Sequence, residues 1–292
     1  MKKQRSLVIR SLLLSGVAAI MFSSCIFLPQ KEQEPETVKT EEVVKDDGTI
    51  VLKKNGLTCV WQDEFDYTGV PNTSKWKYQT GHGNNGWGNS ELQNYTDNTT
   101  VADTAVVEDG VLKIKAKYED GEWKSARLNS KKAWKYGFIE ARLKITDRKG
   151  AWPAFWMMPE GRSDWPECGE IDIMENAPAL EGCDHKVFSS LHAEGHNTEH
   201  PASIGGKTFD QNLSSEWHTF GIMWDDKEIT CYYDDVAVGG YESDGSVRNY
   251  PYNQNFYIIL NLAIGGSLGG TPYVSSLGGE AEFQIDYVRV YQ

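Results

Sequence analysis

The sequence predicts an all-β protein built as a sandwich of two sheets, and two observations support this class. Short runs rich in Val, Ile, Phe and Tyr recur along the chain, and clusters of Gly, Asn and Asp separate them. The sequence shows no long helical period, internal repeat or phosphate-binding Gly loop. About 235 residues follow the N-terminal stretch, a length that one sandwich domain reaches. We therefore expect a single large β-domain over residues 56–292.

Residues 1–24 predict a secretory signal peptide. Four basic residues among the first ten precede an apolar run over residues 12–22, which is too short to span a bilayer permanently. Ser23 and Ser24 then precede Cys25, as in a bacterial lipoprotein signal, although Phe22 stands where Leu is usual. Cleavage there would make Cys25 the lipidated first residue of a membrane-anchored protein. The alternative is a plain secretory signal with cleavage nearby, and both interpretations predict export.

Residues 25–55 predict the lipid anchor site followed by a flexible tether. They contain Pro29, Pro35 and a mixture of charges with scattered apolar residues and no sustained period. About 30 such residues give a root-mean-square span near 30 Å, which would hold a domain clear of a lipid surface. Residues 50–52 could add a short strand. We expect the bacterial cell envelope, with the surface or periplasmic face of the outer membrane favoured and the leaflet left open.

The predicted domain contains runs with the composition of strands. Examples are residues 111–116, 137–143, 229–233 and 256–260. Two sheets packed face to face fit these short runs.

Residues 170–175, which read E-I-D-I-M-E, are the most informative segment. Alternate residues of a strand share a face, so Glu170 and Asp172 point one way while the two Ile side chains point into a core. A β-bulge at Met174 would absorb one residue and return Glu175 to the face of the other two acids. Three carboxylates would then line one surface.

Such a cluster fits glycoside hydrolysis, in which one carboxylate attacks the anomeric carbon and another, with a raised pKa, protonates the departing oxygen. No Lys or Arg lies between Arg162 and Lys186 to neutralise the acids. Glu170 and Glu175 sit about 13 Å apart along a bulged strand, and side chains leaning together could reach the roughly 5 Å of a retaining enzyme. Asp172 between them would tune both pKa values. The alternative is the polar outer face of an ordinary strand.

The pattern E-x-D-x-x-E resembles the signature of family 16 glycoside hydrolases, in the bulged form of laminarinases and related β-glucanases. Other segments resemble the family in the same order, so the resemblance covers about residues 57–292. These segments are residues 61–65, 87–93, 126–127, 151–156, 165–166, 261–266 and 285–291. The resemblance implies a jelly roll with a concave cleft. It also implies that Glu170 is the nucleophile, Glu175 the general acid/base and Asp172 the assisting carboxylate.

The resemblance implies substrate-binding roles for aromatic residues and one arginine. Trp152, Trp156 and Trp165 would lie along the cleft near the scissile bond, where sugar rings stack on aromatic faces. Arg127 would hydrogen-bond sugar hydroxyls. Without the resemblance, Trp152 and Trp156 could equally fill the sandwich core, and Arg127 would be a surface strand residue. Trp165 is favoured for the cleft because it lies five residues from Glu170.

Four further polar residues are implied as substrate ligands. The Gly-rich loop 81–88 would cover the non-reducing side of the cleft, with Asn89 and Glu91 following it. His192 would lie near the leaving group, and Asn261 belongs to a segment that resembles the family. Turn chemistry for the loop and a satisfied interior position for His192 are the alternatives.

The predicted chemistry requires no cofactor. The scattered His residues make a zinc site improbable. The resemblance implies a structural Ca²⁺ on the convex face, with Glu64 and Asp286 as the matching acids. Their alternative role is that of ordinary surface or turn carboxylates.

Four cysteines, Cys59, Cys168, Cys183 and Cys231, remain once Cys25 is lipidated. Export permits disulfides, but four cysteines allow three full connectivities and the sequence does not choose among them. A bridge from Cys168 to Cys183 would brace the strand that carries the acids.

The net charge of −13 restricts the partners. Nucleic acid requires a basic footprint that this chain lacks, and heavily sulfated glycans such as carrageenans would be repelled. The sequence therefore predicts a monomeric, retaining endo-β-glucanase that cuts neutral β-1,3-glucan, mixed-linkage β-1,3/1,4-glucan, or both. Two alternatives stay open: a non-catalytic surface glycan-binding lipoprotein, and an agarase-like or carrageenase-like hydrolase of the same family.

Overall fold

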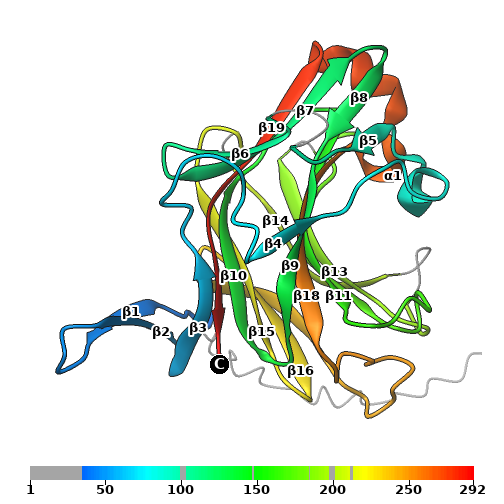
Figure 1. Cartoon of the computed structure of the whole chain (residues 1–292). Coiled ribbons are helices and arrows are strands. Elements are labelled where there is room, and N and C mark those ends of the chain that lie inside the picture. The colour runs from blue at the N-terminus through cyan, green and yellow to red at the C-terminus, as the bar shows by residue number, and fades with distance from the viewer. Residues whose placement is uncertain (1–34, 99–102, 147, 184, 197–200, 211–212) are drawn as a thin grey trace, which may run out of the picture. The chain divides into compact units, whose positions relative to one another are not determined.

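Two largely antiparallel sheets face each other in the computed structural model, which describes residues 35–98, 103–146, 148–183, 185–196, 201–210 and 213–292 (Figure 1). The predicted signal peptide and Cys25 lie outside the described residues. From Pro35 onward the chain forms one compact unit. Within the described ranges, no helix is long and apolar enough to cross a membrane.

The larger sheet has twelve strands in the described part of the chain, and β10, β15 and β19 form its centre. Its strands are β1 (Thr40–Val44), β2 (Ile50–Lys54), β3 (Leu57–Asp63), β5 (Gln93–Tyr95), β6 (Ala105–Glu108), β7 (Val111–Glu119), β8 (Glu122–Ser125), β10 (Gly137–Lys144), β15 (His218–Trp224), β16 (Glu228–Tyr233), β17 (Val236–Glu242) and β19 (Glu280–Tyr291).

The smaller sheet has seven described strands in the order β14-β13-β12-β11-β18-β9-β4. They are β4 (Trp76–Tyr78), β9 (Arg127–Trp134), β11 (Ala151–Pro159), β12 (Glu170–Asn176), β13 (Lys186–His192), β14 (Ala202–Thr208) and β18 (Phe256–Ile264). Short helical segments lie at η1 (Gly86–Ser90), α1 (Gly266–Gly269) and η2 (Thr271–Leu277).

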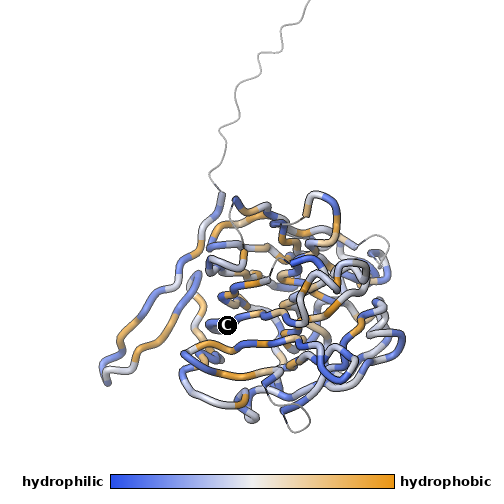
Figure 2. Tube along the Cα trace, turned by 90° about the horizontal axis from the view of Figure 1, so that it is seen from above, coloured by the Kyte–Doolittle hydropathy of each residue, from blue (hydrophilic) through white to orange (hydrophobic). Residues whose placement is uncertain are grey.

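The main core lies between the sheets because successive residues of each strand alternate between the two faces. In β7, Leu112, Ile114 and Ala116 are fully buried while their neighbours are partly exposed. Figure 2 shows the same alternation of apolar and polar positions along the strands. Each fully buried Leu, Ile or Phe contributes about 1.5–3 kcal/mol. The four runs predicted as strands fall in β7, β10, β16 and β18, which confirms the all-β prediction.

The β1–β2 hairpin corrects the predicted tether, because the folded unit begins near residue 35 rather than residue 56. β1 pairs with β2, and β2 pairs with β3, so β1 lies at the edge of the larger sheet (Figure 1). Lys54 in β2 is buried and forms ion pairs with Glu140 and Asp235. The charged composition concealed this hairpin, but Asp47-Gly48 between two partly apolar runs is a hairpin turn signal.

The four described cysteines are all free. The bridge that the sequence allowed between Cys168 and Cys183 is therefore not formed. Cys168 precedes β12 and Cys183 follows it, and a seven-residue strand separates its two ends by about 20 Å, whereas bridged Cα atoms lie within about 7 Å. Cys231 is buried in the core, and this burial raises the pKa of its thiol to about 12.

Candidate active site

The three acids of residues 170–175 lie on one face of β12 because the strand contains a bulge. The register of β12 shifts between Asp172 and Glu175 against β13, and it shifts at the same level against β11. Ile173 and Met174 are both fully buried, so the extra residue is taken up on the core side. The predicted bulge is present, and it leaves Glu170, Asp172 and Glu175 on the opposite face.

Glu170 is held by an indole from the loop that precedes β12. Trp165 Nε1 donates to Glu170 Oε2 at 2.7 Å, and the Trp165 side chain is 39% exposed. The Trp165 ring lies 5.7 Å from the ring of His192, the residue that pairs with Glu170 across the β12–β13 ladder. Sequence spacing from Glu170 placed Trp165 correctly beside the acids.

Glu175 is set up to hold a proton at neutral pH. Burial, reinforced by the negative charge of Glu170, raises the pKa of Glu175 to about 7. Trp152 on β11 donates its Nε1 proton to Glu175 Oε1 at 3.0 Å and orients the carboxyl group. A carboxylic acid with such a pKa suits general acid catalysis near pH 7.

Asp172 and His192 form a buried pair between the two glutamates. His192 Nε2 lies 3.1 Å from Asp172 Oδ2. Burial raises the pKa of Asp172, and the charges of Glu170 and Glu175 add to the effect. Burial alone would lower the pKa of His192, but the hydrogen bond and charge of Asp172 raise it to about 9. The pair therefore keeps a proton at neutral pH. One ligand atom each from Glu170, Asp172 and His192 lies within 4.8 Å of the others, so the three side chains form one tight polar cluster.

Arg127 lies on β9 of the same sheet, with β11 and β18 between it and β12, and its guanidinium group contacts two indole rings. Its guanidinium carbon is 4.6 Å from the Trp87 ring centre and 4.7 Å from the Trp156 ring centre. Trp156 Nε1 donates to Asn261 Oδ1 at 2.7 Å, and Asn261 pairs with Arg127 across β18 and β9. Cation–π contact on both faces fixes the orientation of the buried guanidinium.

A hydrogen-bond network joins the predicted residues Asn89 and Glu91 to Asn261. Asn89 Nδ2 donates to Glu91 Oε1 at 3.2 Å, and Gln93 Nε2 donates to Glu91 Oε2 at 2.6 Å. Tyr95 Oη donates to Glu91 Oε2 at 3.2 Å and accepts from Asn261 Nδ2 at 2.9 Å. The sequence did not predict the roles of Gln93 and Tyr95, or the contact of the Trp87 ring with Arg127. Alternation from Glu91 would have placed Gln93 and Tyr95 on its face.

The Gly-rich loop places Trp87 by an unusual backbone path. Asn85, Trp87 and Ser90 have φ angles of 49°, 58° and 59°, in the left-handed region that side chains rarely adopt. A Cβ atom on Gly83 would lie 2.6 Å from the Trp87 ring, so glycine is required there. The loop is therefore a specific structure that brings an indole over Arg127.

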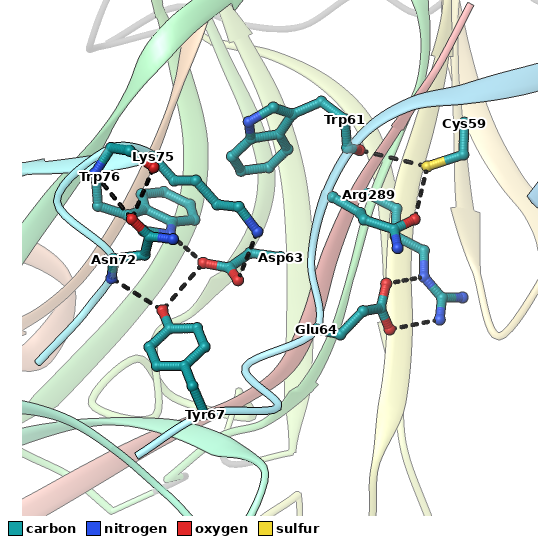
Figure 3. Close-up of polar contacts among 11 residues, drawn as sticks. Cys59, Trp61, Asp63, Glu64, Tyr67, Asn72, Lys75, Trp76 and Arg289 are labelled. Carbon is teal, nitrogen blue, oxygen red and sulfur yellow. Dashed lines mark hydrogen bonds and ion pairs between the residues drawn. The ribbon is translucent and has the colours of Figure 1, made fainter. Parts of the chain in front are cut away.

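Glu64 and Asp286, the acids matched to calcium ligands, are each paired with an arginine. Glu64 accepts two hydrogen bonds of 2.7 Å from Arg289 (Figure 3), and Asp286 Oδ2 accepts one of 2.6 Å from Arg142. Two guanidinium groups beside these carboxylates disfavour a divalent cation. In this arrangement the acids do not fit a shared calcium site, and calcium binding stays a prediction that these contacts do not support.

The arrangement is that of a carbohydrate-cleaving enzyme. Two glutamates share a strand face, burial keeps one of them protonated, indole N–H groups orient both, and a buried Asp–His pair lies between them. Retaining glycoside hydrolysis requires this division between a nucleophile and a proton donor. The aromatic and polar groups beyond them extend the surface along the sheet.

The chain belongs to the glycosyl hydrolases family 16, whose model matches residues 92–289. It is 36% identical to a β-glucanase of Rhodothermus marinus over 80% of this chain and 84% of that protein. It is 35% identical to a glucan endo-1,3-β-glucosidase of Cryptopygus antarcticus, over 78% of this chain and 90% of that protein. The structure of laminarinase from Flavobacterium sp. UMI-01 superposes with a TM-score of 0.72 at 35% identity, covering 80% of this chain and 100% of that one. These comparisons confirm the predicted family and its jelly-roll fold.

Proposed function

We propose that this protein is a retaining endo-β-glucanase that hydrolyses β-1,3-glucan, mixed-linkage β-1,3/1,4-glucan, or both. The observation that carries the proposal is the placement of Glu170 and Glu175 on one strand face, with the pKa of Glu175 raised to about 7. The similar proteins from Rhodothermus, Cryptopygus and Flavobacterium bear the names of β-glucanases, a 1,3-β-glucosidase and a laminarinase, which supports the substrate class.

The reaction follows from the protonation states of the two glutamates. Glu170 attacks the anomeric carbon while Glu175 gives its proton to the leaving glycosidic oxygen. The products of this step are a glycosyl-enzyme ester at Glu170 and an ionised Glu175. Glu175 then takes a proton from a water molecule, which attacks the anomeric carbon and releases Glu170. Neither step requires a cofactor, because the two glutamates supply the nucleophile and carry the proton.

Asp172 and His192 assist this proton cycle. When Glu170 is esterified and Glu175 loses its proton, the negative charge moves from Glu170 to Glu175, and the proton held by the Asp172–His192 pair stays beside it. Beyond the reacting centre, Arg127, Glu91 and Asn261 present fixed polar groups for sugar hydroxyls. The rings of Trp87, Trp156 and Trp165 offer faces on which pyranose rings stack.

A surface protein that only binds glycans is the second candidate, and the site disfavours it. Burying Asp172 and Glu175 beside Glu170 opposes ionisation of Asp172 and Glu175, an unfavourable arrangement that binding alone does not need. An agarase-like or carrageenase-like specificity is a second alternative within the family. The net charge of −13 favours a neutral glycan over a sulfated one.

We also propose export and lipid attachment at Cys25, with the enzyme held at the bacterial envelope. The basis is the N-terminal sequence alone. Because the folded unit begins at Pro35, only about ten residues separate the anchor from the fold, a reach of at most about 35 Å. Incorporation of labelled palmitate into the wild type and its absence from a Cys25→Ser variant would test this, and a labelled Cys25→Ser variant would contradict it.

Product release from a panel of polysaccharides tests the enzymatic proposal. The full chain and its Glu170→Gln variant are incubated with laminarin, barley mixed-linkage glucan, agarose and carrageenan. We expect oligosaccharides from laminarin or barley glucan with the wild type only. Release from the algal galactans alone would leave the catalytic roles and overturn the β-glucanase assignment. Binding without release from any polymer would favour the glycan-binding protein.

A further inference from the structure

The bulge in β12 brings a main-chain carbonyl group, that of Ile173, beside a buried serine of β13. Between Asp172 and Glu175, the two residues Ile173 and Met174 face the single residue Ser189 of β13. The pairing of β13 with β14 shifts register at the same level, between Ser189 and Ser190. Ser189 therefore lies where the regular pairing of β13 is interrupted both toward β12 and toward β14.

A hydroxyl relay across the sandwich satisfies that carbonyl. The Ser189 hydroxyl donates to the Ile173 carbonyl oxygen at 2.7 Å, and Ser189 Oγ lies 2.7 Å from Tyr233 Oη. The serine proton is used toward Ile173, so the Tyr233 hydroxyl donates to Ser189. Ser189 and Tyr233 are both fully buried, and Tyr233 belongs to β16 of the opposite sheet.

The relay matters for chemistry because the bulge decides where Glu175 points. In a regular strand, Glu175 would share the core face of Ile171 and Ile173, since alternate residues share a face. Only the extra residue returns Glu175 to the face of Glu170. Losing a buried hydrogen bond to a main-chain carbonyl is unfavourable, so removing the relay weakens the support of this bulge.

We propose that Ser189 and Tyr233 are positioning residues that hold the bulge and thereby keep Glu175 on the same strand face as its reacting partner Glu170. The inference rests on the proposed glycosidase function for its kinetic consequences. The two residues touch neither substrate nor the catalytic carboxyl groups, and they act through the backbone of Ile173.

Two variants and one matched control test this role in the full chain. Ser189→Ala removes the donor, and Tyr233→Phe removes one oxygen while keeping every packing atom. Ser130→Ala is the control, because Ser130 is a buried serine of the same sheet that donates to the Lys132 carbonyl at 2.7 Å and accepts from Ile258 at 2.9 Å. The measurements are thermal unfolding, kcat, KM and the pH profile of kcat/KM on laminarin or barley glucan.

We expect both relay variants to lower kcat about tenfold to a hundredfold with KM within about threefold, and to move the basic limb of the pH profile by about half a unit or more. The Ser189→Ala/Tyr233→Phe double variant should have a kcat no lower than that of the less active single variant. Both hydroxyls support the same hydrogen bond, the one to the Ile173 carbonyl, so their effects do not add. Ser130→Ala should lower the stability of the protein while leaving kcat and the basic limb of the pH profile unchanged. Tyr233→Phe decides the matter if Ser189→Ala does not fold.

Wild-type kcat and an unmoved pH limb in folded Tyr233→Phe would overturn the positioning role. A wild type that releases no sugar would instead refute the proposed function. In that case crystal structures of both variants decide the inference. A changed register between Asp172 and Glu175 supports it, and an unchanged register with Glu175 in place refutes it.

Discussion

Glu175 illustrates how one residue exchanges stability for reactivity. Its carboxyl group is buried beside Glu170, and that environment resists ionisation until about pH 7. The same resistance supplies a proton at the moment when the glycosidic bond breaks. Each of the following three predictions depends on this shifted pKa or on the division of roles between the two glutamates.

Activity should fall at alkaline pH as Glu175 loses its proton. With the pKa of Glu175 at about 7, kcat/KM should decline roughly tenfold per pH unit above that value. Initial rates on laminarin between pH 4 and pH 10 would measure the limb. An activated aryl β-glucoside, which needs no acid for its departure, should lose this limb in a Glu175→Gln variant. If the activity of Glu175→Gln still fell at alkaline pH, the group responsible would be one other than Glu175.

Glu175→Gln should stabilise the protein at alkaline pH. The folded pKa of about 7 exceeds the ordinary value of 4.5, so between these values the folded state binds more protons and stability falls as pH rises. Above pH 8 the neutral glutamine should therefore gain up to about 3 kcal/mol over the wild type, and at pH 4 almost nothing. Urea unfolding of both proteins at the two pH values measures the difference, and an equal difference at both would contradict the burial argument.

Azide rescue should separate the nucleophile from the acid/base. In Glu170→Gly, azide can attack from the vacated side and give an α-glycosyl azide. In Glu175→Gly, azide can replace water at the glycosyl-enzyme and give a β-glycosyl azide. Nuclear magnetic resonance of the products identifies the anomer. The opposite pattern would exchange the roles of Glu170 and Glu175.

At the scale of elements, local sequence predicted more of β12 than of its surroundings. The bulge, the shared face of the three acids and the position of Trp165 follow from spacing within about ten residues. The network from Glu91 through Tyr95 to Asn261 does not, because β5 and β18 lie far apart in the chain and meet only in the folded protein. Distance along the chain limited the sequence prediction more than any ambiguity of residue type.

The loop over Arg127 should contribute to substrate affinity through Trp87. Removing the ring in Trp87→Ala uncovers one face of the Arg127 guanidinium, whose contact is worth about 1–2 kcal/mol. KM for laminarin oligosaccharides should rise roughly tenfold while kcat changes less than twofold. Tyr118→Ala, which removes an exposed aromatic ring from β7, is the control. Equal KM values for the two variants would remove Trp87 from the binding surface.

At the scale of the whole molecule, the fold uses a second small core outside the sandwich. Val38 from the N-terminal segment packs with Phe138, Tyr232 and Tyr291 on the outer face of the larger sheet. Lys54 and Glu140 form a buried ion pair beside them, and Tyr291 donates a hydrogen bond to Glu140. Sequence patterns predicted only a mixed, charged segment here, because the residues that Val38 contacts come from three distant strands.

Breaking the Lys54–Glu140 pair should destabilise the fold strongly. Lys54→Met leaves a fully buried carboxylate without its cation, which typically costs about 3–5 kcal/mol. The double variant Lys54→Met/Glu140→Gln should recover most of that loss, because no buried charge remains. Chemical denaturation measures both, with Lys45→Ala on the exposed hairpin turn as control. A double variant as unstable as the single one would show that packing, rather than charge, holds the hairpin.

The attachment of the N-terminal segment also determines how mechanical force enters the protein. Val38 donates a backbone hydrogen bond to Asp235 at 2.9 Å, and Thr37 bridges to Val236, so tension on the preceding chain would load β17 of the larger sheet first. β12 and its acids belong to the other sheet. An enzyme pulled from its N-terminus by surface flow or by a moving polymer would therefore yield first where residues 37 and 38 join the larger sheet, before the sheet that carries the acids deformed.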